Sequence, residues 1–262
     1  MSGLAGRTAV VTGGATGIGQ AIARELSALG AAVVIGSRTR ERGEAMAAEL
    51  VGRGGRAMFV ATDVTRSREV EALIAAAVET FGGLDVLVNN SGIEEPEGPE
   101  GPSEDGWDRL FDVNVKGPWL GCRAALPHLL RSRGVILNVA SMAGLVGVAN
   151  GVGYAATKAA IVSMTRSLAL TYAEQGVRVN SVCPGPIMTD MTLAEWDLVG
   201  DHAEGRERAL SVIPARRIGE PEEVAKLAAF LVSDDAAFIT GANVPIDGGK
   251  TAGLMATSRY RW

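Results

Sequence analysis

Short apolar runs that alternate with longer segments of helical period constrain the fold of this chain more than any other feature. The apolar runs lie at residues 8–12, 32–36, 57–61, 85–89, 135–139, 177–182 and 243–246. The segments of helical period lie at 18–29, 40–50, 67–81, 104–131, 152–174 and 221–231. Strands without a polar face are typical of a parallel sheet that helices cover on both sides. The alternation therefore predicts an α/β fold, a doubly wound parallel sheet of about seven strands with helices on both faces.

The size and composition of the chain restrict its domain organisation and its class. Its 262 residues fit one large domain, and we find no linker or repeat, so a single domain over residues 1–262 is expected. A net charge of −5 argues against a nucleic-acid partner. Without an apolar run of membrane-spanning length or an apolar signal region, we expect no membrane partner and a cytoplasmic protein. His128 and His202 lack further ligands at metal-binding spacing, so no metal is expected.

Two segments interrupt the alternation of strands and helices. Residues 94–105 are acidic and contain three prolines, and residues 189–213 are rich in apolar side chains. Both follow predicted strands, and loops at the carboxyl ends of parallel strands surround the ligand crevice. We therefore expect 189–213 to be a substrate lid and 94–105 to border the site, unless 94–105 is only a solvated connection. The C-terminal tail, 251–262, is expected either to fray or to dock through Trp262 on a neighbouring subunit.

A glycine-rich turn joins the first predicted strand to the first predicted helix. It reads Thr12-Gly-Gly-Ala-Thr-Gly-Ile-Gly19. The backbone N–H groups of such a turn, at the N-terminus of a helix, can bind a diphosphate. The turn therefore predicts nucleotide binding, although a purely structural turn is the alternative. The residues expected to contact the nucleotide are Gly13, Thr16, Gly17, Ile18 and Gly19.

The residues after the second strand bear on which nucleotide is bound. An acid in this position accepts a hydrogen bond from the ribose 2′-hydroxyl of NAD, whereas a basic residue suits the 2′-phosphate of NADP. The stretch Gly36-Ser-Arg-Thr-Arg40 has two arginines and no acid. Ser37 and Arg38 are therefore predicted to hold the 2′-phosphate, which makes NADP the preferred cofactor and leaves NAD open. The alternative is that Arg38 is a solvated residue at the start of the next helix.

Candidate catalytic residues come from the middle of the chain. Tyr154 and Lys158 lie four positions apart in a helical segment and so share one face. A nearby ammonium stabilises a phenolate and lowers a tyrosine pKa from about 10, which makes the phenol a usable acid or base. Ser141 directly follows the fifth predicted strand, and Asn114 lies within the helical segment 104–131. Taken singly, Tyr154 could instead be a partly buried core aromatic, Ser141 a turn serine and Asn114 an amide that packs between helices.

Together, these motifs resemble the short-chain dehydrogenase/reductase family. The resemblance covers roughly residues 5–250 and implies a Rossmann-type sheet with a nicotinamide cofactor. It rests on the turn 12–19, Asp63-Val64, Asn89-Asn-Ser-Gly92, Asn114, Ser141, Tyr154-Ala-Ala-Thr-Lys158, and Pro184-Gly185 with Thr189. The family more commonly has alanine where this chain has Ser91, a small departure.

The resemblance also implies a role for each residue. Tyr154 would exchange a proton with the substrate oxygen, and Lys158 would lower the pKa of Tyr154 and bind the nicotinamide ribose. Ser141 would stabilise the developing alkoxide, and Asn114 would hold a water that links Lys158 to solvent. The other cofactor contacts would be Asp63 and Val64 at the adenine, Asn90 and Gly92 at the middle, and Pro184, Gly185, Ile187 and Thr189 at the nicotinamide. Thr189 could instead only cap a lid helix.

These expectations combine into one preferred function and two alternatives. The preferred function is hydride transfer between NADP(H) and the carbonyl or secondary alcohol of a small, mostly neutral substrate. An NAD-dependent sugar or polyol dehydrogenase of the same family is the first alternative, and a non-catalytic nucleotide-sensing scaffold is the second. Members of this family that reduce enoyl thioesters usually have the tyrosine and the lysine farther apart, so the resemblance, with Tyr154 and Lys158 four residues apart, argues against an enoyl thioester reductase. The resemblance further implies a homotetramer, or less often a dimer, joined through 104–131 and 152–174.

Overall fold

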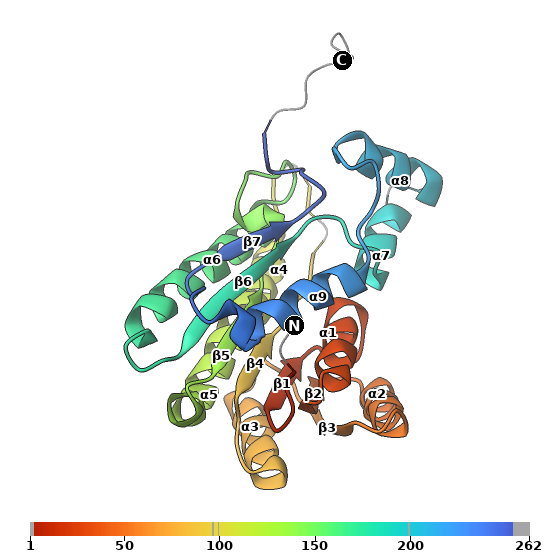
Figure 1. Cartoon of the computed structure of the whole chain (residues 1–262). Helices are drawn as coiled ribbons and strands as arrows, with labels where there is room; N and C mark the ends of the chain where they lie inside the picture. Colours follow the sequence, from red (N-terminus) through yellow and green to blue (C-terminus); the bar gives the residue numbers. More distant parts are fainter. Residues whose placement is uncertain (1–2, 96, 99, 199, 254–262) are drawn as a thin grey trace.

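A sheet of seven parallel strands forms the centre of the protein (Figure 1). The computed structural model describes residues 3–95, 97–98, 100–198 and 200–253, so Trp262 and most of the predicted tail lie outside the described residues. The strands are β1 (Thr8–Thr12), β2 (Ala32–Ser37), β3 (Arg56–Ala61), β4 (Val86–Asn89), β5 (Val135–Val139), β6 (Arg178–Pro184) and β7 (Asn243–Ile246). Their positions agree with the apolar runs, and the predicted α/β fold is confirmed.

Helices cover both faces of this sheet (Figure 1). One face carries α1 (Gly17–Ala28), α2 (Arg40–Gly52) and α9 (Pro221–Val232). The other carries α3 (Ser67–Phe81), α5 (Gly117–Ser132) and α6 (Val152–Tyr172). Successive strand residues point to opposite faces, and this explains why the strands lack a polar side: Val11 packs in the first layer and Val10 in the second.

The order of the strands fixes where a ligand can bind. From β1 the sheet continues through β2 to β3 on one side and from β4 to β7 on the other, so the chain reverses direction across the sheet between β1 and β4. At such a reversal the loops after neighbouring strands diverge and leave a crevice at the carboxyl ends of the strands.

The segment 104–131 differs from the single helix that its periodicity predicts. It consists of α4 (Glu104–Phe111), a π-helical turn η1 (Asp112–Lys116) and then α5. The Gly117 N–H donates to the carbonyl of Asp112, a five-residue step. Pro118 has no N–H and cannot form the α-helical bond to the carbonyl of Asn114, which accounts for the wider turn at this place.

The predicted lid segment, 189–213, contains two helices, α7 (Asp190–Leu198) and α8 (His202–Ser211). Both project beyond the sheet in Figure 1. Trp196 is buried in a small apolar cluster with Ile213 of this segment and Ile218 just after it, so this side chain packs against the lid and the residues that follow it. Among the helices of the described residues, none has the length and apolar character needed to cross a bilayer.

Candidate active site

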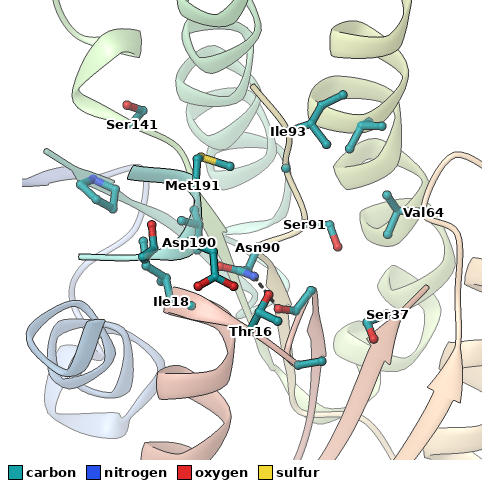
Figure 2. A pocket seen from close by; sticks show the side chains of 18 of the residues that line it. Thr16, Ile18, Ser37, Val64, Asn90, Ser91, Ile93, Ser141, Asp190 and Met191 are labelled. Carbon is teal, nitrogen blue, oxygen red and sulfur yellow. Dashed lines mark hydrogen bonds between the residues drawn. The ribbon is translucent and has the colours of Figure 1, made fainter. Parts of the chain in front are cut away.

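A pocket of about 430 Å³ opens at the carboxyl ends of the strands, where the strand order reverses. Its wall is formed by the segments that follow six of the strands, β1 to β6, together with the start of α7. Figure 2 shows Ser37 and Val64 at one end and Ser141 at the other, with Thr16 and Asn90 between them. The pocket therefore extends from the end of β2 to the end of β5.

The pocket brings together all but two of the residues that the sequence predicts for the site. Its wall includes Gly13, Thr16, Gly17, Ile18, Ser37, Arg38, Asp63, Val64, Asn90, Gly92, Ser141, Tyr154, Lys158, Pro184, Gly185, Ile187 and Thr189. The other two, Gly19 and Asn114, are buried behind the wall. Both of these contact wall residues, as described below.

The glycine turn is held to the end of β4 by an amide side chain. Asn90 Nδ2 donates to the carbonyls of Thr12 and Gly13, at 3.0 and 3.1 Å. Gly13 has a φ of +64°, a conformation that strains other residues. A Cβ on Gly19 would lie 2.3 Å from both the Asn90 amide nitrogen and the Gly13 oxygen. Gly19 therefore supports the turn by leaving room for it.

The N-terminus of α1 points its free N–H groups at the pocket. Thr16 occupies the N-cap position in an extended conformation, and the first turn, residues 17–20, carries no charged side chain. The first N–H groups of a helix have no partner inside the helix, and the helix dipole favours an anion there. This end of α1 is therefore suited to bind a diphosphate.

Basic residues gather at the Ser37 end of the pocket. Arg38 is exposed in the wall, and Arg42 of α2 lies beside it in the same wall. Arg42 Nη1 is 3.6 Å from the Asp190 carboxylate at the start of α7, an ion pair between two exposed side chains. Burial raises the pKa of Asp63, but hydrogen bonds from Thr65 and the charges of nearby arginines, Arg38 included, outweigh burial and hold it below its usual value. Asp63 is thus an anion that offsets part of this positive charge.

Tyr154 and Lys158 face each other in the pocket, as their spacing predicts. Both are in α6, and the Lys158 ammonium lies 5.5 Å from the centre of the Tyr154 ring. Lys158 is buried, and its ammonium donates to the carbonyl of Val139 at 3.2 Å. Burial lowers the pKa of Lys158 to about 8, against an opposing contribution from the charge of Glu94. The pair therefore combines a phenol with a cation that titrates not far above neutrality.

Ser141 serves as a cap and also lies in the pocket wall. It precedes the short 3₁₀ helix η2 (Met142–Gly144), and its oxygen accepts a hydrogen bond from the Ala143 N–H at 3.1 Å. A hydroxyl that accepts in this way keeps its own proton for a further bond. Ser141 can therefore be a turn residue and still donate a hydrogen bond into the pocket.

Asn114 joins three parts of the site from its place in the π-helical turn. Its Oδ1 accepts from the Ile93 N–H at 2.8 Å, and its Nδ2 donates to the Ile93 carbonyl at 2.9 Å and to Thr157 Oγ1 at 3.2 Å. Gly92 lies between Asn114 and Lys158, since a Cβ there would be 3.4 Å from both polar side-chain ends. The amide thus fixes the segment after β4 against α6.

Thr189 has a structural contact in addition to its place in the pocket. It immediately precedes α7, and its Oγ1 accepts from the Thr192 N–H at 3.4 Å. Thr189 therefore caps α7, as the alternative interpretation expected, and it also lies in the pocket wall.

Comparisons with known proteins agree on the family of the chain. A family profile described as enoyl-(acyl carrier protein) reductase matches residues 13–251. The chain is 40% identical over 252 residues to the 2,5-dichloro-2,5-cyclohexadiene-1,4-diol dehydrogenase of Sphingobium indicum, covering 96% of this chain and 98% of that protein. The chain belongs to the short-chain dehydrogenase/reductase family.

Further relatives show the same family over nearly the whole chain. The meso-2,3-butanediol dehydrogenase of Serratia marcescens is 42% identical over 246 residues, with 94% of this chain and 95% of that protein covered. Among solved structures, levodione reductase superposes with a TM-score of 0.91 at 34% identity and covers 95% of this chain and 99% of its own. This short-chain dehydrogenase/reductase is an NAD(P)-dependent enzyme that acts on CH–OH groups.

Several wall residues of this short-chain dehydrogenase/reductase were not predicted from its sequence. They are Ala15, Thr39, Arg42, Thr62, Ser91, Ile93, Val113, Val139, Ala140, Asp190, Met191 and Thr192. Most are neighbours of predicted residues, so the motif positions alone could have suggested them. Arg42 has no predicted residue next to it, and the packing of α2 places it at the pocket.

Proposed function

We propose that the enzyme transfers a hydride between NADP(H) and the carbonyl or secondary alcohol of a small, mostly neutral substrate. The observation that carries this proposal is the arrangement of Tyr154, Lys158 and Ser141 in one pocket with an anion-binding helix N-terminus. A scaffold that only senses a nucleotide would need the helix N-terminus and not the other three side chains. The proposed role is therefore catalytic.

In the proposed reaction, the protein residues move a proton and stabilise charge. Tyr154 gives its proton to the carbonyl oxygen during reduction and takes a proton from the alcohol during oxidation. The ammonium of Lys158 stabilises the phenolate form of Tyr154. Ser141 donates a hydrogen bond to the substrate oxygen as negative charge develops on it. When bound, the nicotinamide supplies or accepts the hydride.

The residues of the pocket fit a dinucleotide placed along its length. Thr16, Gly17 and Ile18 would hold the diphosphate with backbone N–H groups, because the turn lines the pocket there and carries no acid. Gly13 would line the same place without donating, since its N–H already donates to the carbonyl of Gly36 at 2.7 Å. The remaining proposed contacts are Asp63 and Val64 at the adenine, Asn90 and Gly92 at the middle, and Pro184, Gly185, Ile187 and Thr189 at the carboxamide. Gly19 would contribute indirectly, by leaving room for the glycine turn behind the pocket wall.

NADP is proposed rather than NAD because of the charges at the Ser37 end. Arg38 and Arg42 both lie in the wall there, and a guanidinium binds a phosphate with charge-assisted hydrogen bonds. Ser37 adds a hydroxyl. The nearest acid in the sequence of this loop is Glu41, within α2, so the end of β2 offers no carboxylate for a ribose 2′-hydroxyl.

A second candidate is an NAD-dependent sugar or polyol dehydrogenase. The names of relatives favour its sugar or polyol substrate and say nothing of the cofactor: glucose 1-dehydrogenase 2 of Bacillus subtilis is 40% identical over 252 residues, and butanediol dehydrogenase is similarly close. Other relatives are named for cyclic secondary alcohols, which suits the apolar Ile93 and Met191 in the wall. Enoyl thioester reduction, named in the profile description, is disfavoured by the spacing of Tyr154 and Lys158.

The test is a titration of the protein with NADPH and NADH, followed by initial rates with small ketones and cyclic secondary alcohols. We expect tighter binding of NADPH and hydride transfer with at least some of these substrates.

Arg38→Ala should weaken NADPH binding about 10–100-fold and leave NADH binding nearly unchanged. Arg40→Ala is the matched control, since Arg40 pairs with Glu44. A clear preference of the wild type for NADH would contradict the use of Arg38, and no turnover with either cofactor would contradict the function.

We also propose that the enzyme is a homotetramer. The helices expected to join the subunits carry exposed apolar side chains, notably Trp119 on α5 and Leu170 on α6, which are 47% and 84% exposed. Large apolar side chains on a helix surface are typical of a face that a partner covers.

A further inference from the structure

The acidic loop between β4 and α4 is fastened to two helices and is more than a solvated connection. Glu95 pairs with Arg109 of α4 through two hydrogen bonds of 3.0 Å each. Glu97, the next acid that the structure describes in this loop, reaches α6. Its Oε2 accepts from the Gly153 N–H at 3.0 Å, and its Oε1 accepts from the Tyr154 N–H at 2.8 Å.

The N-terminus of α6 requires an acceptor from elsewhere in the chain. Val152 is the first residue of the helix, so the N–H groups of Gly153 and Tyr154 belong to the first turn and have no partner within it. The N-cap residue is Gly151, which has no side chain to accept them. Glu97, more than 50 residues earlier, supplies both oxygens. A carboxylate is also the group that the positive end of a helix dipole favours.

Gly153 leaves the space that this contact needs. A Cβ on Gly153 would lie 2.9 Å from Leu110 Cδ1 and from Pro102 Cγ, and 3.2 Å from the Glu97 carboxylate. Any larger residue would push the loop and the carboxylate away from the helix. The close approach of loop and helix thus depends on both Glu97 and Gly153.

We propose that Glu97 is a positioning residue for Tyr154: its carboxylate caps α6 from the acidic loop and fixes the turn from which the phenol projects. The proposal rests on the catalytic role proposed above for Tyr154. Because Tyr154 lies at the third position of the helix, fraying of this turn moves its Cα directly. A displacement of about 1 Å at a reacting group can lower a rate about 100-fold. Glu97 touches the backbone of Tyr154 and acts through it.

The first experiment compares Glu97→Ala and Glu97→Gln with the wild type in two measurements. Glu97→Ala should lower kcat about 10-fold or more while changing the dissociation constant for NADPH less than about 2-fold. Glu97→Gln keeps one acceptor oxygen and should lose less. Hydrogen exchange of a peptide covering residues 150–156 should become faster in the same order. Glu100→Gln, which removes the same charge from an exposed position of the loop, is the control and should resemble the wild type.

A second variant tests the same contact from the helix side. Gly153→Ala improves the intrinsic helix propensity of α6, yet we expect it to lower kcat and speed exchange like Glu97→Ala. Gly52→Ala in α2, where a Cβ meets nothing within 4 Å, is the control for the propensity effect. An unchanged kcat in Glu97→Ala and Gly153→Ala would overturn the proposal, as would a fall in kcat without faster exchange.

The exchange measurement separates this proposal from the proposed function. If the wild type turns over none of the ketones and alcohols tested with either cofactor, the proposed function fails, and the claim that Glu97 positions a catalytic phenol fails with it. The exchange rates of the apo-protein then still show whether Glu97 holds the first turn of α6. If the wild type is active and only the exchange is unaffected by Glu97→Ala, the function stands and the inference on Glu97 is wrong.

Discussion

The ammonium group of Lys158 is buried, and its removal from water makes its charged form unfavourable. Burial lowers the pKa of this lysine from 10.5 to about 8. A depressed lysine pKa means that the folded protein disfavours the charged form relative to the unfolded chain. The penalty is fully present below about pH 8 and disappears as the pH rises towards 10.5. A group retained at such a cost is typical of a functional site.

Lys158→Met should therefore make the protein without cofactor more stable near neutral pH. We expect a gain of about 1–3 kcal/mol in the free energy of unfolding at about pH 7, together with a loss of turnover. The gain should shrink between pH 8 and pH 10.5. Denaturant unfolding at several pH values, at one protein concentration, measures it. Lys226→Met, at an exposed position of α9, is the control, and a variant less stable than the wild type at all pH values would refute the argument.

For single residues, the sequence predicted many of the side chains at the pocket, whereas most of the contacts that position them depend on tertiary packing. Tyr154, Lys158 and Ser141 have recognisable spacing or follow a strand directly, and their occurrence together with the other family motifs, rather than local geometry alone, predicted them as site residues. The water-holding role expected for Asn114 stays a prediction, while its bonds to Ile93 and Thr157 depend on tertiary packing. Glu97 was only one of several acids in a loop, and nothing in the local sequence distinguishes it from Glu100.

At the scale of elements, a chain of buried polar side chains ties β4, β5 and α6 together beneath the pocket. Asn89 and Asn138 are opposite each other in neighbouring strands, and Asn89 Nδ2 donates to Asn138 Oδ1 at 2.9 Å. Asn138 Nδ2 in turn donates to Thr165 Oγ1 of α6 at 2.9 Å. Since these side chains are buried, a hydrogen bond lost between two of them is not easily replaced by water. The network fixes α6, and with it Tyr154, against the sheet.

Asn138→Ala should lower the free energy of unfolding by about 2–4 kcal/mol, because it leaves Asn89 and Thr165 without one of their partners. Thr165→Val alone should cost less, and the double variant should cost clearly less than the sum of the two. Thermal or denaturant unfolding of the three variants gives the coupling energy. Additive costs would show that the three side chains do not act as one network.

The helices and strands were largely predictable because strand burial and helical period are local signals. The π-helical turn was not predicted, because a proline in a helical segment does not by itself specify one: Pro118 follows the π-helical turn, whereas Pro127 lies inside α5. The sequence predicted a lid over 189–213 but not the two helices within it. Their apolar residues, such as Trp196, pack on each other and on Ile213 rather than on the sheet, so they lack the usual pattern of a helix on a core.

The association of subunits depends, in the proposed homotetramer, on the exposed face of α6. Leu170→Asp should reduce the tetramer population, because it places a charge on the face of α6 proposed to meet another subunit. Light scattering coupled to size exclusion at several concentrations measures this. Val51→Asp on α2, 53% exposed and outside the proposed interface, should leave assembly unchanged. A wild type that is monomeric at all concentrations would contradict the proposed homotetramer.

In the proposed reaction one phenol carries the proton, and Tyr154→Phe is the simplest test of that role. This change removes a single oxygen and keeps the ring beside Lys158. Binding of NADPH should stay within about 2-fold of the wild type, while kcat should fall about 100- to 10,000-fold. Tyr172→Phe, at the other end of α6, is the control and should retain full activity. Turnover by Tyr154→Phe close to that of the wild type would contradict the account.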